Sequence, residues 1–102
     1  MANETVFKRY KNNPIITANA VPRASSIHNS AIIPFEDGFI GVFRVDEIDL
    51  NFTLHLGKSK DGINWEIEPD KIKFESKNPE LYISRQSYDP RITKLDDTYY
   101  IT

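Results

Sequence analysis

Apolar and polar positions along the chain form short patterns of strand length, separated by turn residues. Residues 39–45 are almost wholly apolar apart from Arg44, which predicts a strand buried on both faces in the middle of a sheet. Residues 52–56 alternate between apolar and polar, which predicts a neighbouring strand, and residues 30–33 predict a shorter strand ended by Pro34. No useful length of chain carries a helical period. The sequence therefore predicts an all-β fold.

Turn residues join these strands into hairpins. Asp37-Gly38 and Asp61-Gly62 each offer a glycine where a tight turn demands a positive φ. The second turn lies in the run Ser59-Lys60-Asp61-Gly62-Ile63-Asn64-Trp65. This run resembles the Ser-x-Asp-x-Gly-x-x-Trp turn of sialidase-like propellers, but it is one residue shorter between the aspartate and the glycine. We interpret it as a structural turn.

The segments around these hairpins are less regular. Residues 5–10 alternate weakly and predict an edge strand, and residues 17–26 predict a loop. Residues 65–67 predict an outer strand, which residues 72–74 either continue or pack beside. Residues 75–87 form a polar connection, and connections of this kind often carry binding residues.

One pattern occurs twice, with a constant offset from Asn29 to Asp89 of 60 residues. Residues 32–39 align without a gap on residues 92–99. Each copy reads as a polar residue, a short apolar strand, an acidic turn and an aromatic strand, which is typical of a hairpin. A hairpin that recurs at this spacing suggests the blades of a β-propeller, whose innermost strands line a central channel. Asn29 and Asp89 would then face the same funnel.

The length of the chain sets the expected domain organisation. Its 102 residues hold fewer than two of these units, whereas a propeller needs about 4 to 8 blades to close its ring. We therefore expect residues 1–102 to be the N-terminal part of a single β-propeller catalytic domain. Within it, residues 1–26 form an N-terminal strand and loop, residues 27–86 the first blade unit, and residues 87–102 the start of the second. A self-contained two-sheet β domain is the alternative.

Composition excludes several classes of function. The formal net charge of −2, with both signs interspersed, shows no basic stripe and argues against nucleic acid as a partner. The chain has no cysteine and two histidines without ligand spacing, so we expect neither a disulfide nor a metal site. No glycine-rich phosphate loop and no apolar run of about 20 residues occurs. A cytoplasmic protein without a membrane partner is the prediction.

Asp89 is a candidate general acid. It precedes Pro90, whose ring favours an extended backbone at Asp89 and so holds the side chain in a defined direction. A carboxyl group at the mouth of a channel can act as an acid if desolvation raises its pKa. Alternatively, Asp89 caps a turn or pairs with Arg91, and strand geometry would place those two side chains on one side. Such a pair would lower the pKa of Asp89.

The remaining polar candidates suit a sugar. Arg44 lies in an apolar strand and needs an anionic or hydroxyl-rich partner, either a bound carbohydrate or phosphate or an internal ion pair with Asp46 or Asp89. Asn29-Ser30 offers donors and acceptors for sugar hydroxyls, or alternatively caps a turn. Tyr88 could stack on a sugar ring or belong to the core.

Taken together, five motifs resemble the N-terminal part of glycoside hydrolase family 130. They are Asn13-Pro14-Ile15, Asn29-Ser30-Ala31-Ile32, Phe43-Arg44-Val45, Ser59-Lys60-Asp61-Gly62 and Tyr88-Asp89-Pro90-Arg91. That family comprises five-bladed β-propellers, mostly phosphorylases of β-mannosides. The resemblance spans nearly the whole chain and about the first third of a family enzyme. It implies a five-bladed propeller of which this chain supplies the beginning.

The resemblance also implies roles for the candidate residues. The catalytic acid of the Asp-Pro-Arg motif falls on Asp89, the residues that hold the sugar before the cleaved bond fall on Asn29, Ser30 and Arg44, and Tyr88 lies towards the leaving sugar. The implied reaction is inverting phosphorolysis by a glycosyltransferase-type enzyme, with inorganic phosphate as co-substrate and no cofactor. Phosphate attacks a non-reducing-end β-1,4-mannosyl unit and releases α-mannose 1-phosphate. The acid passes its proton through a mannose hydroxyl, unlike the direct acid of ordinary inverting glycosidases.

Two other functions stay open at this point. Phosphate must be bound by cationic groups, and in family enzymes these lie on later blades. A β-mannoside hydrolase, an activity of some relatives, and a non-catalytic sugar-binding β domain are therefore the alternatives. The leaving sugar and a homo-oligomer are also left open. We expect residues 1–102 alone to be inactive, because the ring would be open and the phosphate site missing.

Overall fold

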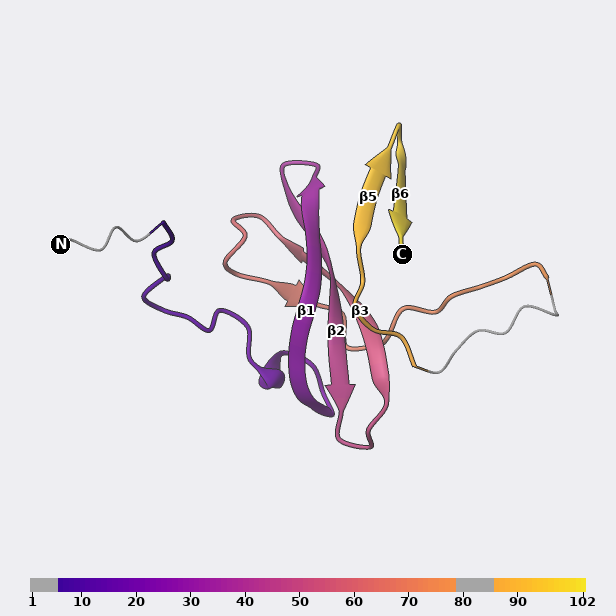
Figure 1. The fold of residues 1–102 in the computed structure, drawn as a ribbon, viewed down its shortest axis with the longest axis horizontal. Coiled ribbons are helices and arrows are strands. Elements are labelled where there is room, and N and C mark those ends of the chain that lie inside the picture. The colour runs from indigo at the N-terminus through magenta and orange to yellow at the C-terminus, as the bar shows by residue number, and fades with distance from the viewer. Residues whose placement is uncertain (1–5, 79–85) are drawn as a thin grey trace.

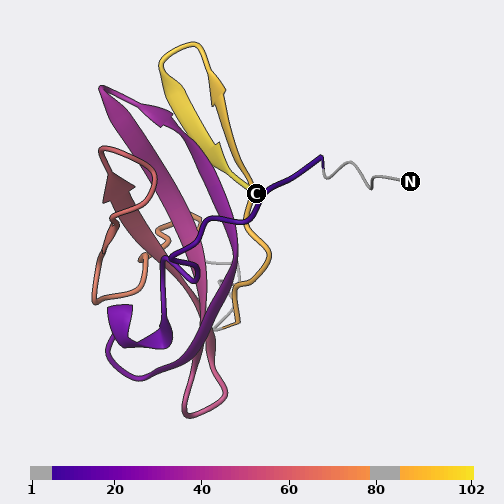
Figure 2. The same ribbon diagram turned by 90° about the vertical axis from the view of Figure 1, so that its left-hand side faces the viewer.

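The computed structural model describes residues 6–78 and 86–102, which form two antiparallel sheets (Figures 1 and 2). A short 3-10 helix, η1 (Ala18–Ala20), precedes the first sheet. That sheet has the order β1 (Ala24–Phe35), β2 (Gly38–Glu47), β3 (Phe52–Ser59), β4 (Glu66–Ile67). The second sheet is a hairpin of β5 (Ile92–Leu95) and β6 (Thr98–Ile101). The described part of the chain thus confirms the all-β prediction.

The core lies along β2, which is flanked by β1 on one side and β3 on the other. Val42, Phe43 and Val45 are at most 1% exposed. The Phe43 ring packs edge-to-face against Trp65, with 5.1 Å between the ring centroids. The apolar run at residues 39–45 therefore forms the buried central strand that the sequence predicts.

Strand β1 is longer than the predicted strand at residues 30–33, and Pro34 does not end it. Pro34 pairs with Phe39 inside the β1–β2 ladder. Because β1 is an edge strand of its sheet, a residue without an N–H group can be accommodated there. The ladder changes register between His28 and Ala31, where Asn29 has a φ of 49°. This irregularity is a β-bulge that lies within β1.

The two copies of the sequence pattern have closely similar backbone φ angles at two pairs of equivalent positions. Asn29 and Asp89 have φ values of 49° and 51°, and Glu36 and Asp96 have values of 53° and 54°. The hairpin pairing is also equivalent, since Phe35 pairs with Gly38 in one copy and Leu95 with Thr98 in the other. The two hairpins touch through the rings of Phe35 and Tyr99, whose centroids are 5.5 Å apart. In Figure 1 the yellow β5–β6 hairpin stands beside the upper part of β1 and β2.

Three predicted segments differ in the structure. The predicted loop at residues 17–26 contains η1 and the first three residues of β1. Residues 6–10 of the predicted edge strand 5–10 form no strand, and Figure 1 shows this indigo segment lying away from the sheet. The predicted outer strand 65–67 is reduced to β4. Beyond it, residues 72–74 do not continue β4 as a strand, and Ile72 donates its N–H to the Leu54 carbonyl of β3 at 2.8 Å. Part of the predicted connection 75–87 lies outside the described residues. Among the described residues, no helix has the length and apolar character needed to cross a membrane.

Candidate functional site

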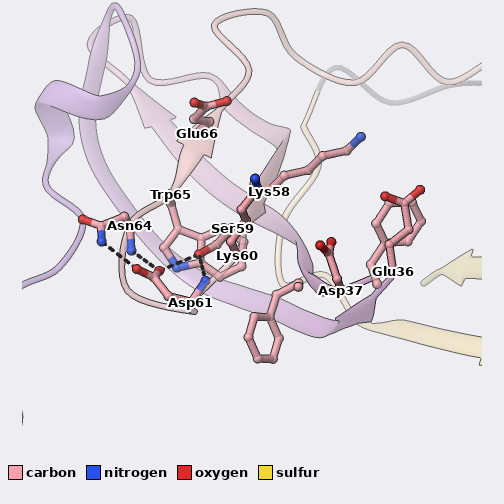
Figure 3. Close-up of a pocket in the computed structure, with 12 residues that line it drawn as sticks. Glu36, Asp37, Lys58, Ser59, Lys60, Asp61, Asn64, Trp65 and Glu66 are labelled. Atoms are coloured by element: carbon pink, nitrogen blue, oxygen red, sulfur yellow. Dashed lines mark hydrogen bonds between the residues drawn. The ribbon is translucent and has the colours of Figure 1, made fainter.

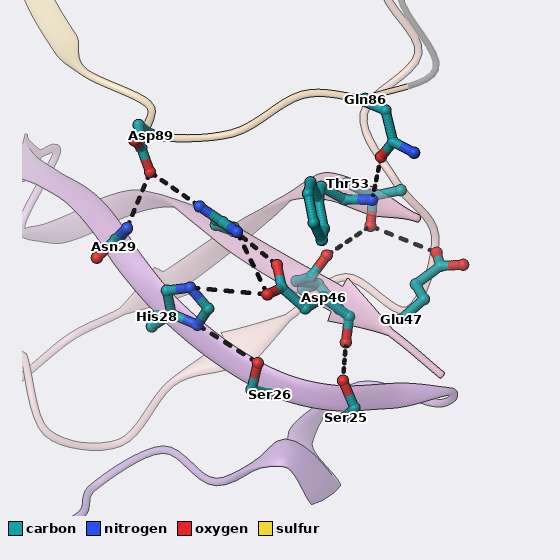
Figure 4. A network of polar contacts seen from close by, with 12 residues as sticks. Ser25, Ser26, His28, Asn29, Asp46, Glu47, Thr53, Gln86 and Asp89 are labelled. Carbon is teal, nitrogen blue, oxygen red and sulfur yellow. Dashed lines mark hydrogen bonds and ion pairs between the residues drawn. The ribbon is translucent and has the colours of Figure 1, made fainter. Parts of the chain in front are cut away.

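Three of the predicted site residues meet at one point (Figure 4). Asn29 comes from β1, Arg44 from β2, and Asp89 from the segment that precedes β5. The Asn29 amide donates to Asp89 Oδ1 at 2.8 Å, and Arg44 Nη1 donates to the same oxygen at 3.1 Å. Asn29 and Arg44, which precede Asp89 by 60 and 45 positions in the sequence, are thus joined to it through a single carboxylate oxygen.

The backbone of Asp89 differs from the predicted extended conformation. Its φ of 51° lies in the left-handed region, which Asn and Asp tolerate better than most residues. The strand geometry that would have placed Asp89 and Arg91 on one side therefore does not apply. The Asp89 carboxylate bonds instead to Asn29 and Arg44, and the backbone of Arg91 pairs with Thr102.

The Arg44 guanidinium is held on several sides. Its Nε and Nη2 groups donate to the two carboxylate oxygens of Asp46, at 2.8 Å and 3.3 Å. Its Cζ atom lies 4.7 Å from the centroid of the Phe52 ring and 5.6 Å from that of Tyr88. The Arg44 side chain is only 15% exposed. Both internal partners considered for Arg44 from the sequence, Asp46 and Asp89, are therefore present together.

The hydrogen bonds at Asp89 favour its charged form. The bond from Asn29 lowers the pKa of Asp89 most, and the bond and positive charge of Arg44 lower it further. Burial acts in the opposite direction but is outweighed, since 61% of the side chain is exposed. In this state the desolvation that would raise the pKa of a general acid is too weak to prevail, and Asp89 is a hydrogen-bond acceptor. The pKa of Arg44 is raised, chiefly by its hydrogen bond to Asp46.

Ser30 and Tyr88 lie beside this cluster without bonding to Asp89. Ser30 follows Asn29 in β1 and is exposed. Tyr88 is 58% exposed, which excludes a place in the core of the described structure, and its ring stands edge-on to Phe52 at 6.2 Å. An exposed aromatic face beside hydrogen-bond donors is suited to contact with a sugar ring.

The sequence indicated two of the neighbours only weakly. Phe52 was read as part of a strand, yet its ring lies against the Arg44 guanidinium. His28 has Nε2 3.8 Å from Asp46 Oδ2 and Nδ1 3.4 Å from the Ser26 hydroxyl. The sequence did carry a signal for the contact between Arg44 and Asp46, because residues two apart on a strand share one face. It carried no comparable signal that Phe52 or His28 would lie beside them.

Apart from this cluster, the structure has a pocket of about 440 Å³ between the β1–β2 turn and the β3–β4 turn (Figure 3). Three of its polar side chains, Ser59, Asp61 and Asn64, make hydrogen bonds within the β3–β4 turn. Asp61 accepts hydrogen bonds from the N–H groups of Ile63 and Asn64, from the Asn64 amide and from the Ser59 hydroxyl. These bonds, the Asn64 N–H bond first, lower the pKa of Asp61. They agree with the interpretation of Ser59 to Trp65 as a structural turn. In the described part of the chain, no cluster of three or more side chains is arranged to hold a metal ion.

Comparison with known proteins gives two findings. The family model of glycoside hydrolase family 130, described as beta-1,4-mannooligosaccharide phosphorylase, matches residues 3–102. Over 103 aligned positions the chain is 44% identical to a beta-1,4-mannooligosaccharide phosphorylase from Ruminococcus albus. The alignment covers 95% of this chain and 31% of that relative, so the chain spans less than a third of the relative's length.

Proposed function

Because the chain belongs to glycoside hydrolase family 130, we propose that it is the N-terminal part of a phosphorylase acting on β-1,4-mannosides. The family match and the name of the Ruminococcus albus relative support this reaction class. The observation that carries the proposal is the convergence of three side chains on one point: Asn29 and Arg44 from the β1–β2 hairpin, and Asp89 from the segment that leads into the β5–β6 hairpin.

We also propose that the complete protein is a five-bladed β-propeller. The equivalent hairpins at Asn29 and Asp89, with matching backbone angles and pairing, support a repeated blade. In this arrangement residues 27–86 form the first blade unit, residues 87–102 begin the second, and residues 1–26 precede them. The cluster then lies where two successive units meet.

In the proposed reaction Asp89 is the catalytic acid, and Asn29, Ser30 and Arg44 bind the mannosyl unit at the non-reducing end. Sugar hydroxyls replace the hydrogen bonds that Asn29 and Arg44 make to Asp89 in the free protein. The loss of these donors and the exclusion of water raise the pKa of Asp89, which then binds a proton. Tyr88, exposed beside the cluster, contacts the leaving sugar.

The chemical step exchanges one bond at the anomeric carbon. The proton of Asp89 passes through a mannose hydroxyl to the glycosidic oxygen, whose bond to the anomeric carbon breaks. An oxygen of inorganic phosphate forms the new bond from the opposite face, which inverts the configuration. The products are α-mannose 1-phosphate and the shortened sugar. Cationic groups must bind the attacking phosphate, and we place them outside residues 1–102.

The test is phosphate-dependent release of mannose 1-phosphate from a β-1,4-linked mannosyl disaccharide by the full-length protein. Asp89→Asn removes the acid while retaining the shape of the side chain, so we expect turnover to fall by about 10²–10⁴-fold. Asp97 lies in the exposed turn between β5 and β6, so Asp97→Asn is the matched control and should have the activity of the wild type. Free mannose formed equally without phosphate would instead make the protein a hydrolase. Binding without turnover would make it a sugar-binding domain.

A further inference from the structure

Asp46 has the closest contacts to Arg44 in the cluster, although it makes no hydrogen bond to Asp89. It lies two residues after Arg44 on β2, with its side chain 21% exposed. Each of its carboxylate oxygens accepts one hydrogen bond from the guanidinium, at 2.8 Å and 3.3 Å. A two-bond contact of this kind fixes both the position and the plane of a guanidinium.

This contact decides which way the remaining N–H groups of Arg44 point. A guanidinium carries five N–H donors in a rigid plane. With Nε and Nη2 bonded to Asp46, Nη1 is directed at Asp89 Oδ1, 3.1 Å away. The Phe52 ring on β3 and the Tyr88 ring limit the tilt of that plane. Arg44 alone, on a flexible side chain, would have no such preferred orientation.

We propose that Asp46 is a positioning residue of the mannoside site, which orients the Arg44 guanidinium toward Asp89 and the sugar and offsets its positive charge. This inference rests on the proposed function for its catalytic consequence. Its structural part, the control that Asp46 exerts over Arg44 and Asp89, does not depend on which reaction the protein catalyses.

The charges around Arg44 give the sign of the effect. Asp46 on β2 and Asp89 before β5 share this one guanidinium. His28 on β1 has Nε2 3.8 Å from Asp46 Oδ2, and its positive charge also lowers the pKa of Asp89. The neighbouring β3 contributes the uncharged Phe52. When Asp46 becomes neutral, the whole charge of Arg44 acts on Asp89 and a nearby negative charge disappears. Both changes favour the ionised form of Asp89, which then takes up the catalytic proton less readily.

The experiment compares Asp46→Asn, Asp46→Glu and Asp49→Asn in the full-length protein. We expect Asp46→Asn to lower kcat/KM by about 10–10²-fold, since a small misplacement of a binding group can cost that much. The basic limb of its pH profile should move to lower pH, because the acid loses its proton earlier. Asp46→Glu retains the charge and should recover part of the activity. Asp49 pairs with Arg23 on the surface, so Asp49→Asn should leave both quantities unchanged.

A carboxyl-carbon NMR titration of Asp89 in the same proteins separates this inference from the proposed function. The pKa of Asp89 should be lower in Asp46→Asn than in the wild type and should return toward the wild-type value in Asp46→Glu. An unchanged titration in Asp46→Asn would overturn the inference, as would a wild-type pH profile combined with equal activity losses in Asn and Glu variants. A wild-type protein that releases no mannose 1-phosphate would contradict the proposed function alone, because the titration still reports on Asp46.

Discussion

The packing of Phe43 over two glycines predicts a measurable cost for Gly57→Ala. Gly41 on β2 and Gly57 on β3 are paired directly across the ladder, and the Phe43 ring lies over both. A Cβ atom added at Gly57 would stand 2.7 Å from Phe43 Cε2 and 3.2 Å from Ile67 Cγ1. The first distance is below any normal carbon–carbon contact, so the ring or the strand must shift.

Two opposing terms set the magnitude. Phe43 is 1% exposed and packs against Trp65, so the ring has no free space to move into, and overpacking of this kind costs about 1–3 kcal/mol. Replacing a strand glycine by alanine recovers about 0.5–1 kcal/mol of chain entropy. The net expectation for Gly57→Ala is a loss of about 1–2 kcal/mol in the free energy of unfolding.

A double-mutant cycle with Phe43→Leu identifies the cause. Leucine removes the ring edge that meets the new methyl group, so Gly57→Ala should cost less in the Phe43→Leu background, by about 1 kcal/mol of coupling. The assay is urea denaturation of the four full-length proteins, compared by midpoint at a constant slope. If Gly57→Ala is as stable as the wild type, or if the effects of the two substitutions are additive, the Phe43 ring is free to move away from a methyl group at position 57.

Two further predictions concern buried and turn hydrogen bonds. His55 donates from Nδ1 to the Glu68 carbonyl at 2.9 Å, so its Nε2 accepts from the Thr53 hydroxyl at 3.0 Å. Thr53→Val leaves that buried nitrogen unpaired and should lower the unfolding free energy by about 1–3 kcal/mol, whereas Thr53→Ser should cost less, as measured by thermal denaturation. The pKa of Asp61 is lower in the folded than in the unfolded state, so its stabilisation is complete above the unfolded pKa and is lost as the pH falls through the folded one. Asp61→Asn should therefore have a lower Tm than the wild type at neutral pH, and the difference between the two Tm values should narrow below about pH 4. A difference that stays constant with pH would show that the Asp61 carboxylate does not stabilise the turn.

The order of strands was predictable because it depends on local pattern. The apolar run around Phe43 predicted the central strand, and the two glycine turns predicted the β1–β2 and β3–β4 hairpins. In the first of these turns the positive φ falls on Glu36 and not on the predicted Gly38. The extent of β1 was not predictable, because a proline interrupts a central strand but is tolerated in an edge strand. Only the assembled sheet shows that β1 is an edge strand. The conformation of Asp89 escaped prediction for a similar reason. Pro90 favours an extended backbone at Asp89, but this local preference was outweighed by hydrogen bonds to Arg44 and Asn29, which are distant in the sequence.

The candidate site was predictable as a set of residues but not as a network. The sequence offered Asp46 and Asp89 as alternative partners of Arg44, and local spacing could not show that one guanidinium bonds to both. Such sharing depends on how closely the segment before β5 approaches β2, which is a tertiary property. The same approach places the Tyr88 ring beside Arg44, so stacking and hydrogen bonding at this arginine are set by one packing event.

The repeat itself explains why this contact is asymmetric. Asn29 and Asp89 occupy equivalent positions with nearly the same φ, and they bond directly to one another. Two aspartates at this distance would repel until one bound a proton, and two asparagines would leave Arg44 Nη1 without a charged acceptor at this point. The Asn29–Asp89 pair combines an amide donor with a charged acceptor, so the side chains of the two units differ at this position while the backbone φ stays nearly the same. The contact between Phe35 and Tyr99 holds the hairpins together, and the geometry at Asp89 therefore depends on the packing of one unit against the next.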